Sequence, residues 1–322
     1  MNWLITGGCG FIGSSLAGRL LEDSKNKVCA FDNLTIGSIE DLTNNTNCEV
    51  KQCADAPDWS VPLSLVVGDI SDVEQTKSAL KGADVVVHLA ANTGVGPSVV
   101  DPVSDCKNNV QGTLNVLEAC RTAEVTRMVF ASSGAPLGVQ TPPLHEEMAA
   151  RPMSPCGASK LAGEGYCSAY FHCFGIKSVV LRFGNVYGEG SAKKESVVAK
   201  FIKRAMNGEI LEIYGDGDQT RDFIHISDLL EAVYLAATTD GVGGEVFQIA
   251  TAKETTMNEL TEALVEAIQN VSGIKPEWIC TEARLGDVAR NYSDTRKAKE
   301  QLGWAALVNL EEGLHQTVRS YM

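Results

Sequence analysis

The sequence lacks the features that mark membrane, secreted and metal-binding proteins. No apolar run approaches the roughly 18–20 residues that a membrane span needs. The first residues have neither the basic start nor the apolar stretch of a signal peptide. The 10 cysteines are scattered, without a C-x-x-C pair or a zinc-like Cys/His spacing. We therefore expect a cytoplasmic protein without a metal, because scattered thiols fit a reducing compartment.

Basic residues are also scarce. The chain has 27 Lys and Arg against 41 Asp and Glu, which gives a formal net charge of −14. Nucleic acid and anionic membranes would both be repelled, so we expect neither as a partner. The 322 residues, of which 44% are hydrophobic and 21% charged, suffice for one large α/β domain and a smaller one.

Short apolar runs alternate with helical patterns in the first half of the chain. Their near-continuous Val, Ile, Leu and Phe predict parallel strands that are buried on both faces. The order of elements predicts an α/β fold with a doubly wound parallel sheet of Rossmann type. The expected strands are 2–6, 27–32, 63–68, 84–89, 126–131 and 178–182, and the expected helices are 11–21, 72–80 and 105–122. Residues 43–62 are weakly patterned, so we expect a surface excursion there.

The rhythm becomes less regular after residue 182. Helical patterns at 197–206, 227–238, 257–268 and 310–321 are separated by Gly-rich turns. We therefore divide the chain into a first domain over 1–182 and a smaller C-terminal α/β domain over 183–322, which is interleaved with the first.

Glycines at 7, 10 and 13 follow the first expected strand and open the first expected helix. Glycine is needed where the backbone turns tightly and approaches a pyrophosphate, and the N-terminus of a helix favours that negative charge. Asp32 stands 19 residues after Gly13, at the end of the second strand. Its carboxylate would accept hydrogen bonds from the adenosine ribose and repel a 2′-phosphate. A plain tight turn is the alternative, but this context favours a site for NAD rather than NADP.

The G-x-x-G-x-x-G spacing resembles the short-chain dehydrogenase/reductase superfamily. Gly68-Asp-Ile70 is similar to the superfamily's adenine-contacting segment, and His88-Leu-Ala-Ala91 to the turn that lies along the cofactor. A helix N-cap is the alternative for Asp69, and we expect His88 to be a structural histidine rather than a proton carrier. The resemblance implies these cofactor-binding residues: Gly7, Gly10, Phe11, Ile12, Gly13, Asp32, Asn33, Asp69, Ile70, Leu89, Ala90, Ala91 and Lys160.

The catalytic signature of this superfamily is Ser or Thr followed by Tyr-x-x-x-Lys. There the Tyr removes a proton from a substrate hydroxyl, the Lys lowers the Tyr pKa and holds the nicotinamide ribose, and the Ser hydrogen-bonds the reacting oxygen. Residues 130–138 resemble the serine segment and place Ser133 at the catalytic position. Residues 154–164 resemble S-P-Y-G-A-S-K-x-x-G-E, with Cys156 in place of Tyr and Lys160 one helical turn further on.

The cysteine changes what the site can do. A thiol has a suitable pKa, near about 8.5 before any help from Lys160. Its reach is several ångströms shorter than that of a phenol, however, and proton transfer needs heavy atoms within about 3 Å. We therefore expect chemistry that is crippled or carried by a water molecule. An engineered or incidental inactivation and a natural variant with altered function are both consistent with Cys156.

The second half resembles the UDP-galactose 4-epimerase-like branch of the NAD-dependent epimerase/dehydratase family. The similar segments are R-x-x-N-V-Y-G at 182–188, G-D-G-x-Q-T-R-D at 215–222 and R-x-G-D-V at 284–288, and the resemblance runs from about residue 2 to 304. It implies that Asn185, Arg221 and Arg284 meet the diphosphate. Two arginines suit a diphosphate because each guanidinium can donate two hydrogen bonds. The implied substrate-binding residues are Thr93, Ser133, Asn185, Val197, Phe201, Tyr214, Arg221, Arg284 and Asp287.

The residues after Ser133 bear on the reaction. Dehydratase relatives carry an Asp-Glu pair there and decarboxylase relatives an acidic residue, whereas this chain has Gly134 and Ala135. The resemblance thus implies a UDP-sugar 4-epimerase that works through a transient 4-keto sugar with tightly bound NAD. It also implies a homodimer that pairs through helices 105–122 and 155–172.

Alternatives stay open at this point. The chain could be a non-catalytic pseudoenzyme that binds NAD and a UDP-sugar, or a dehydratase or decarboxylase relative. A reductase of small carbonyl compounds is disfavoured by the two predicted phosphate-binding arginines. By resemblance, Asn291 lies near the residue that limits space for a 2-acetamido group. The sequence does not choose among glucose/galactose, their N-acetyl forms and uronic acids.

Overall fold

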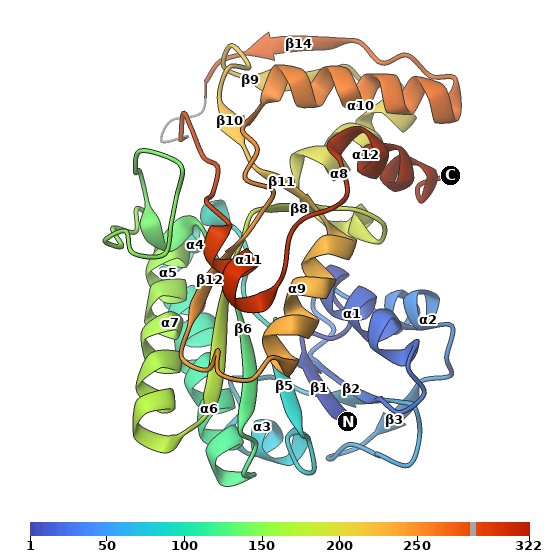
Figure 1. The fold of residues 1–322 in the computed structure, drawn as a ribbon. Coiled ribbons are helices and arrows are strands. Elements are labelled where there is room, and N and C mark those ends of the chain that lie inside the picture. The colour runs from blue at the N-terminus through green and yellow to red at the C-terminus, as the bar shows by residue number, and fades with distance from the viewer. Residues whose placement is uncertain (284–287) are drawn as a thin grey trace. The chain divides into compact units, whose positions relative to one another are not determined.

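Eight strands form one large parallel sheet flanked by helices, which confirms the predicted Rossmann-type α/β fold (Figure 1). The computed structural model describes residues 1–283 and 288–322. The strand order is β12-β7-β6-β5-β1-β2-β4-β3. The strands are β1 (Asn2–Thr6), β2 (Lys27–Asp32), β3 (Lys51–Cys53), β4 (Leu63–Val67), β5 (Val85–His88), β6 (Arg127–Ser133), β7 (Lys177–Phe183) and β12 (Val246–Ile249).

The chain reverses its direction across this sheet at β1. β1 pairs in parallel with β2 on one side and with β5 on the other, so Thr6 lies opposite both Phe31 and His88. The chain first builds the β2-β4-β3 side and then returns to β5. The carboxyl ends of β1 and β5 therefore form the switch point at which open α/β sheets bind ligands.

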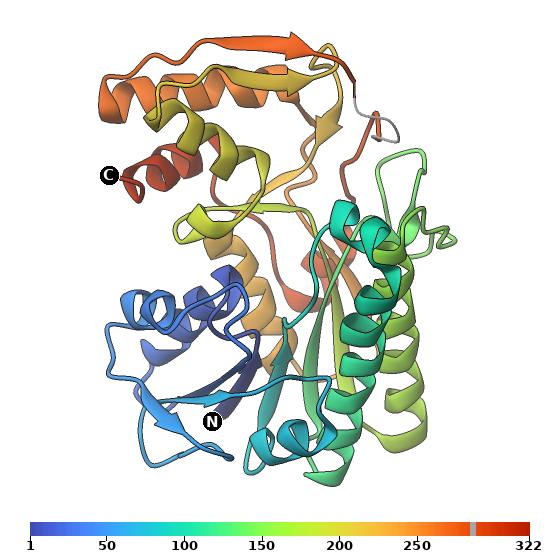
Figure 2. The same ribbon diagram turned by 180° about the vertical axis from the view of Figure 1, so that it is seen from behind.

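Helices cover both faces of the sheet (Figure 2). The alternation of side chains along β1 decides which residues meet which layer. Leu4 joins an apolar cluster with residues of the helices on one face. Trp3 points to the other face, where its ring stacks on Tyr234 with 6.0 Å between centroids. The helices are α1 (Phe11–Leu21) and α2 (Ile39–Thr46) on one face, and α3 (Val73–Ala79), α6 (Gly112–Thr122) and α7 (Pro155–Phe174) on the other.

The predicted surface excursion at 43–62 contains parts of two elements that its sequence did not predict. Helix α2 ends inside it and begins at a capping box, in which the Ser38 N–H donates to Asp41 Oδ2 at 2.9 Å and the Asp41 N–H to Ser38 Oγ at 3.3 Å. Strand β3 pairs in parallel with β4 and closes the sheet edge. The three residues of β3 are polar or small and largely exposed, so the apolar run that marks a buried strand is missing.

The predicted helix 105–122 is interrupted. It consists of α5 (Pro102–Cys106), a π-helical turn η1 (Lys107–Gln111) and α6. A short helix α4 (Val95–Val100) precedes it. The turn KNNVQ has Val110 as its one apolar residue, so its sequence has too few apolar positions for the helical period to be read there.

The chain divides into two compact units. The first unit is 1–139, 146–182 and 232–247, and the second is 140–145, 183–231 and 248–322. The chain therefore passes between the units several times, and one of these crossings follows Arg182. Elements that lie wholly in the second unit are β8 (Asn185–Tyr187), α8 (Val197–Met206), β9 (Leu211–Tyr214), β10 (Thr220–Arg221), β11 (Phe223–His225), β13 (Thr255–Thr256), α10 (Met257–Ser272), β14 (Trp278–Thr281), α11 (Arg296–Leu302) and α12 (Leu310–Arg319). Helix α9 (Ile226–Thr238) begins in the second unit and ends in the first.

The second unit has its own core, which is formed by α8, α10 and α12 with β9. Three short strand pairs complete the unit: β8 with β11, β10 with β13 and β9 with β14. Among the residues that the structure describes, no helix of either unit is long and apolar enough to cross a bilayer.

Candidate active site

The glycine loop lies between β1 and α1, at the switch point of the sheet. Gly7 has a φ of +68°, and a Cβ there would meet Ala90 N at 2.8 Å. A Cβ on Gly13 would approach the Gly7 carbonyl oxygen to 2.3 Å. Both positions thus require glycine because of close backbone approach. Helix α1 starts at Gly10 without a side-chain cap from the described residues and without an acidic residue in its first turn. Such a helix terminus fits a pyrophosphate.

Asp32 lies at the end of β2, as predicted. Its carboxylate is largely buried and accepts hydrogen bonds from the Cys9 N–H at 2.9 Å and the Leu34 N–H at 2.8 Å. Burial raises the pKa of Asp32, and the two N–H groups oppose that effect. The two donors fix the carboxylate beside the glycine loop. Each oxygen keeps a lone pair that can accept a ribose hydroxyl.

Asn33 and Asp69, both predicted at the cofactor, contact each other. Asn33 Nδ2 donates to Asp69 Oδ2 at 2.9 Å, and Asp69 Oδ1 accepts from the Ser71 N–H at 2.7 Å. These hydrogen bonds lower the pKa of Asp69 against the effect of burial, which is the largest single influence on it. The alternative reading of Asp69 as a helix N-cap is wrong, because Asp72 caps α3 by accepting from Glu74 N and Gln75 N.

His88 has a structural role, as expected. The ring is buried, with Nδ1 at 2.7 Å from Thr6 Oγ1 and Nε2 at 3.0 Å from Thr113 Oγ1. Burial lowers the pKa of His88 to about 3, so the imidazole is neutral at working pH. The next residues, 89–91, leave β5 beside Gly7, and the Ala90 N–H donates to Thr6 Oγ1 at 3.1 Å. Ile70 is buried against α6, where it touches Gly112.

Strand β6 and helix α7 bring the three predicted catalytic residues into one region of the first unit. Ser133 ends β6, while Cys156 and Lys160 lie in the first turns of α7. The helix can approach the strand closely because Gly163 faces Phe130, where a Cβ would be 2.4 Å from the ring. Lys160 Nζ consequently donates to the Ala131 carbonyl at 2.7 Å. Burial lowers the pKa of Lys160 to about 8.

The thiol of Cys156 differs from the expectation. We predicted a pKa that suits proton transfer, but burial raises the pKa of this half-buried thiol, and Asp105 raises it further. Lys160 and a hydrogen bond from the Gly94 backbone lower the pKa without overcoming burial. The neutral thiol therefore dominates near pH 7. The predicted substrate residue Thr93 is exposed and lies next to Gly94 in sequence.

Sequence reasoning missed a buried carboxylate beside these groups. Asp105 on α5 accepts from Ser159 Oγ at 2.6 Å and from Asn109 Nδ2 at 2.8 Å. Asn109 belongs to the π-helical turn and also donates to the Asn92 carbonyl at 2.9 Å. The sequence offered one hint of this contact: Ser159, which bonds Asp105, directly precedes the predicted catalytic Lys160. Nothing in the composition of α5 distinguishes Asp105 from a solvent-exposed acid.

A second buried network of hydrogen bonds connects β6 to α7 and β7. Glu164, one turn after Lys160 on α7, accepts from Arg182 Nε at 2.9 Å and Nη2 at 2.7 Å. Ser132 Oγ donates to Glu164 Oε1 at 2.6 Å. Glu164 and Arg182 are each 6% exposed in their side chains. This ion pair joins α7, β6 and β7 next to Ser133.

The second unit carries most of the predicted substrate residues. Asn185 is exposed at the start of β8. Val197 begins α8, and Phe201 in the same helix is 2% exposed within the core. Phe201 thus has a packing role, and its contact with a uracil ring stays a prediction. Tyr214 ends β9, and Lys200 Nζ lies 5.5 Å from the centre of its ring.

Arg221 lies on β10 and is held by backbone. Its Nη1 donates to the Thr220 carbonyl at 2.6 Å and to the Val288 carbonyl at 2.7 Å. Arg284 and Asp287, which are also predicted to bind the substrate, lie outside the described residues. Their roles stay predictions from sequence.

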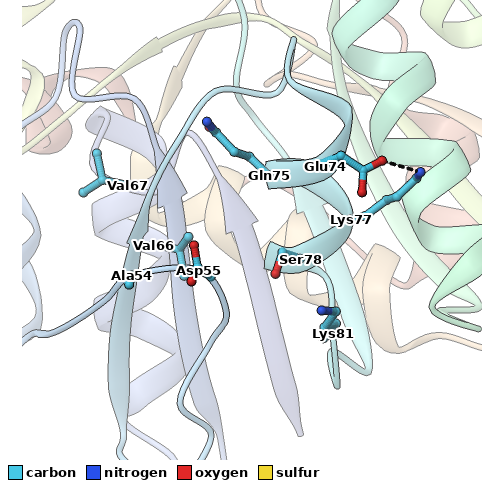
Figure 3. Close-up of a pocket in the computed structure, with 9 residues that line it drawn as sticks. All are labelled: Ala54, Asp55, Val66, Val67, Glu74, Gln75, Lys77, Ser78 and Lys81. Carbon is cyan, nitrogen blue, oxygen red and sulfur yellow. Dashed lines mark hydrogen bonds and ion pairs between the residues drawn. The ribbon is translucent and has the colours of Figure 1, made fainter.

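A cavity of about 660 Å³ lies elsewhere on the first unit, between β4 and α3 (Figure 3). Its charged residues balance, with Asp55 and Glu74 against Lys77 and Lys81, and Glu74 forms an ion pair with Lys77. None of the predicted site residues lines it. The lining residues are Ala54, Asp55, Val66, Val67, Glu74, Gln75, Lys77, Ser78 and Lys81. Balanced charge gives no net attraction for a phosphate, so we do not place the active site there.

Comparison with known proteins shows the family of this chain. The model of the NAD dependent epimerase/dehydratase family matches residues 3–250. A UDP-glucose 4-epimerase of Mycolicibacterium smegmatis is 35% identical over 327 aligned positions, which cover 100% of this chain and 98% of that protein. A crystal structure of UDP-glucose 4-epimerase from Thermotoga maritima with UDP-glucose has a TM-score of 0.87 at 34% identity, covering 100% of this chain and 98% of that one.

A second similar structure was solved with the cofactor bound. The UDP-glucose 4-epimerase of Thermus thermophilus in complex with NAD has a TM-score of 0.84 at 34% identity, covering 100% of this chain and 99% of that one. Fold, glycine loop and Asp32 define a dinucleotide-binding α/β protein. The chain belongs to the NAD dependent epimerase/dehydratase family. The cofactor is NAD, in agreement with the loop geometry and with Asp32.

Proposed function

We propose that the chain is a UDP-sugar 4-epimerase in which Cys156 occupies the place of the catalytic tyrosine. The observation that carries this proposal is the position of Ser133, Cys156 and Lys160 on β6 and α7, with Lys160 Nζ bonded to the Ala131 carbonyl. In this proposal the first unit holds NAD and the reacting groups, and the second unit holds the UDP. The ten cysteines are all free thiols, which fits a reducing cytoplasm.

Each residue has a defined task in this reaction. NAD, when bound, supplies reversible hydride acceptance and return at the sugar C4. Ser133 donates a hydrogen bond to the C4 oxygen, and its own oxygen is oriented by the Ala135 N–H at 3.2 Å. Lys160 holds the nicotinamide ribose and supplies positive charge near the C4 oxygen. The proton of the C4 hydroxyl needs an acceptor, and the short neutral thiol of Cys156 is a poor one.

Epimerisation suits the site better than dehydration. Ser133 is followed by Gly134 and by a short 3₁₀ turn over Ala135–Leu137, which presents backbone rather than a carboxylic acid. Asp105 lies in the same region, but Ser159 and Asn109 already occupy its oxygens. A dehydratase or decarboxylase would need an acid directed at the sugar. The positions after Ser133 do not supply one.

A non-catalytic role is the second candidate, and one observation favours it. Burial and Asp105 keep the pKa of Cys156 above its ordinary value, so the position offers no base at neutral pH. A protein of this kind would bind NAD and a UDP-sugar as a sensor. The difference between the two candidates lies in turnover and not in binding.

A screen of UDP-sugars on the chain and on its Cys156→Tyr variant tests both candidates. Glucose/galactose, N-acetyl and uronic acid forms are each assayed for binding and for the C4 epimer as product. The epimerase proposal expects at least one sugar to be converted by the tyrosine form. Binding without conversion in either form would support the sensor, and absence of UDP-sugar binding would refute both.

We also propose a homodimer. Four valines of α4 and α5 are exposed next to α7, and they reach 86% exposure at Val100 (Figure 1). They are Val95, Val99, Val100 and Val103. Phe174 at the end of α7 is 53% exposed. The apolar residues of α6 are instead buried in their own unit, so α4, α5 and α7 supply the surface.

An apolar surface of this kind is typical of a protein–protein contact. The variant Val99→Glu/Val103→Glu should be monomeric in sedimentation at micromolar concentration, while the unmodified chain sediments as a dimer. A monomeric mass for the unmodified chain would refute the proposal.

A further inference from the structure

Strand β10 lies between two other segments of the second unit. On one side it pairs with β13, with Thr220 opposite Thr256. On the other side the Thr220 N–H donates to the Ala289 carbonyl at 2.9 Å. The segment 288–291, which we call the strap, therefore continues the pairing of β10 on its second edge.

Glu254 connects the strap to β10 from the loop before β13. Its Oε1 accepts from Thr220 Oγ1 at 2.7 Å and from Arg290 Nε at 2.7 Å, and its Oε2 accepts from Arg290 Nη2 at 2.6 Å. Thr220 Oγ1 in turn lies 3.3 Å from the Asn291 N–H. One carboxylate thus fixes two consecutive strap residues.

The position of the strap determines how Arg221 is held. Arg221 Nη1 donates to the Thr220 carbonyl at 2.6 Å and to the Val288 carbonyl at 2.7 Å. The Thr220 carbonyl belongs to β10 itself, whereas the Val288 carbonyl belongs to the strap. A shift of the strap would therefore turn the guanidinium, whose planar fork is directional.

We infer that Glu254 is a positioning residue for the nucleotide: through Arg290 and Thr220 it keeps the strap in the register that orients Arg221 toward the diphosphate. This inference rests on the proposed function, in which Arg221 binds UDP. Glu254 itself does not touch the substrate. It acts on affinity through a second residue.

The ion pair is suited to tuning a site rather than to holding the fold together. The side chains of Arg290 and Glu254 are 55% and 25% exposed, and exposed pairs contribute little to folding stability. Arg290 holds the pKa of Glu254 at about 2, so the carboxylate is charged at every working pH. Removal of the pair should therefore loosen the strap without unfolding the unit.

A double-mutant cycle with UDP as the probe tests the inference. Dissociation constants for UDP are measured by calorimetry on the NAD-loaded chain and on Glu254→Ala, Arg221→Ala and the double variant. We expect Glu254→Ala to weaken UDP about 3- to 10-fold, on the scale of a well-formed ion pair. In the Arg221→Ala background the same change should have no further effect, because the residue it orients is absent.

Two further variants give the matched comparison. Arg290→Ala should reproduce Glu254→Ala. Arg296→Ala removes a similar two-nitrogen pair, with Asp294 at 2.9 and 2.6 Å, and should leave UDP affinity unchanged. Glu254→Gln keeps an acceptor for Thr220 and should fall between Glu254→Ala and the unmodified chain. The melting temperature and NAD content are recorded for each variant.

The outcomes separate the inference from the proposed function. Additive losses for Glu254→Ala and Arg221→Ala, or an equal loss for Arg296→Ala, would overturn the positioning role. A fall in UDP affinity that follows a fall in melting temperature would do the same. If the unmodified chain binds NAD but no UDP at all, the proposed function fails before the inference is tested.

Discussion

The two units hold their predicted site residues in opposite ways. In the first unit the charged groups beside the predicted catalytic residues are buried: the side chains of Glu164 and Arg182 are each 6% exposed, and burial lowers the pKa of Lys160. In the second unit the pair next to Arg221 is open to solvent, with Arg290 55% exposed. Breaking a buried ion pair leaves an unpaired charge in the interior, whereas an exposed pair can be lost at little cost. A substitution at Cys156, which lies beside these buried groups in the first unit, should therefore change the rate of epimerisation more than the affinity for the UDP-sugar.

The Cys156→Tyr variant is the strongest test of this difference between the two units. We expect single-turnover epimerisation to rise by about 10²–10⁴-fold, the usual worth of a positioned proton acceptor. The binding constant for the UDP-sugar should hardly change, because the hydroxyl acts in the transition state. A fast cysteine form that gains nothing from tyrosine would show that another group accepts the proton. A rate that rises with pH to a midpoint near 8 would identify that group as Lys160.

Glu164→Gln tests the buried ion pair between Glu164 and Arg182 in the first unit. Removal of one partner leaves Arg182 charged and unpaired in the interior, so the free energy of unfolding should fall by about 3–5 kcal/mol in urea titrations. Glu74→Gln is the matched control, because it breaks the exposed pair with Lys77 in the same unit and should cost less than about 1 kcal/mol. Equal losses in the two variants would contradict the contrast between buried and exposed pairs.

Arg221→Ala and Arg284→Ala test the predicted phosphate-binding arginines of the second unit. Each should weaken UDP-sugar binding by about 10- to 150-fold, which corresponds to about 1.5–3 kcal/mol for a charge-assisted pair. NAD content should stay the same in both. Unchanged UDP binding in both variants would move the substrate site elsewhere.

His88 gives an effect that depends on pH, and its sign follows from burial. Its folded pKa of about 3 lies below the unfolded value of about 6.5. The contribution of His88 to stability is therefore fully present above pH 6.5. As the pH falls toward 3, the imidazole is protonated in the unfolded state but not in the folded state. The free energy of unfolding therefore drops by about 1.4 kcal/mol per pH unit.

The variant His88→Asn should lose stability less steeply than the unmodified chain between pH 6.5 and 5, as measured by urea unfolding at each pH. The variant should start from a lower stability at pH 8, because the bonds to Thr6 and Thr113 are altered. Parallel pH profiles of the two chains would refute the assignment.

Sequence patterns predicted the parts of this molecule that depend on local spacing. The glycine loop, Asp32 and the central strands were found because buried parallel strands and tight turns leave continuous signals. Strand β3 was missed because an exposed edge strand of three residues has no apolar run. Asp105 and Glu164 were missed because only the folded chain shows which carboxylates are buried. The pKa of Cys156 was misjudged for the same reason, since burial outweighs the nearby lysine.

The π-helical turn between α5 and α6 gives one helical run two different phases. A π turn accommodates one extra residue, so the residues after it are rotated by about 100° relative to an unbroken α-helix. Before the turn, Asp105 faces α7 and bonds Ser159. After it, Thr113 bonds His88, and Asn115 bonds the Ile70 carbonyl at 2.9 Å. Deletion of a single residue from 107–111 would bring the two halves into phase, and one of these two surfaces would then lose its partners.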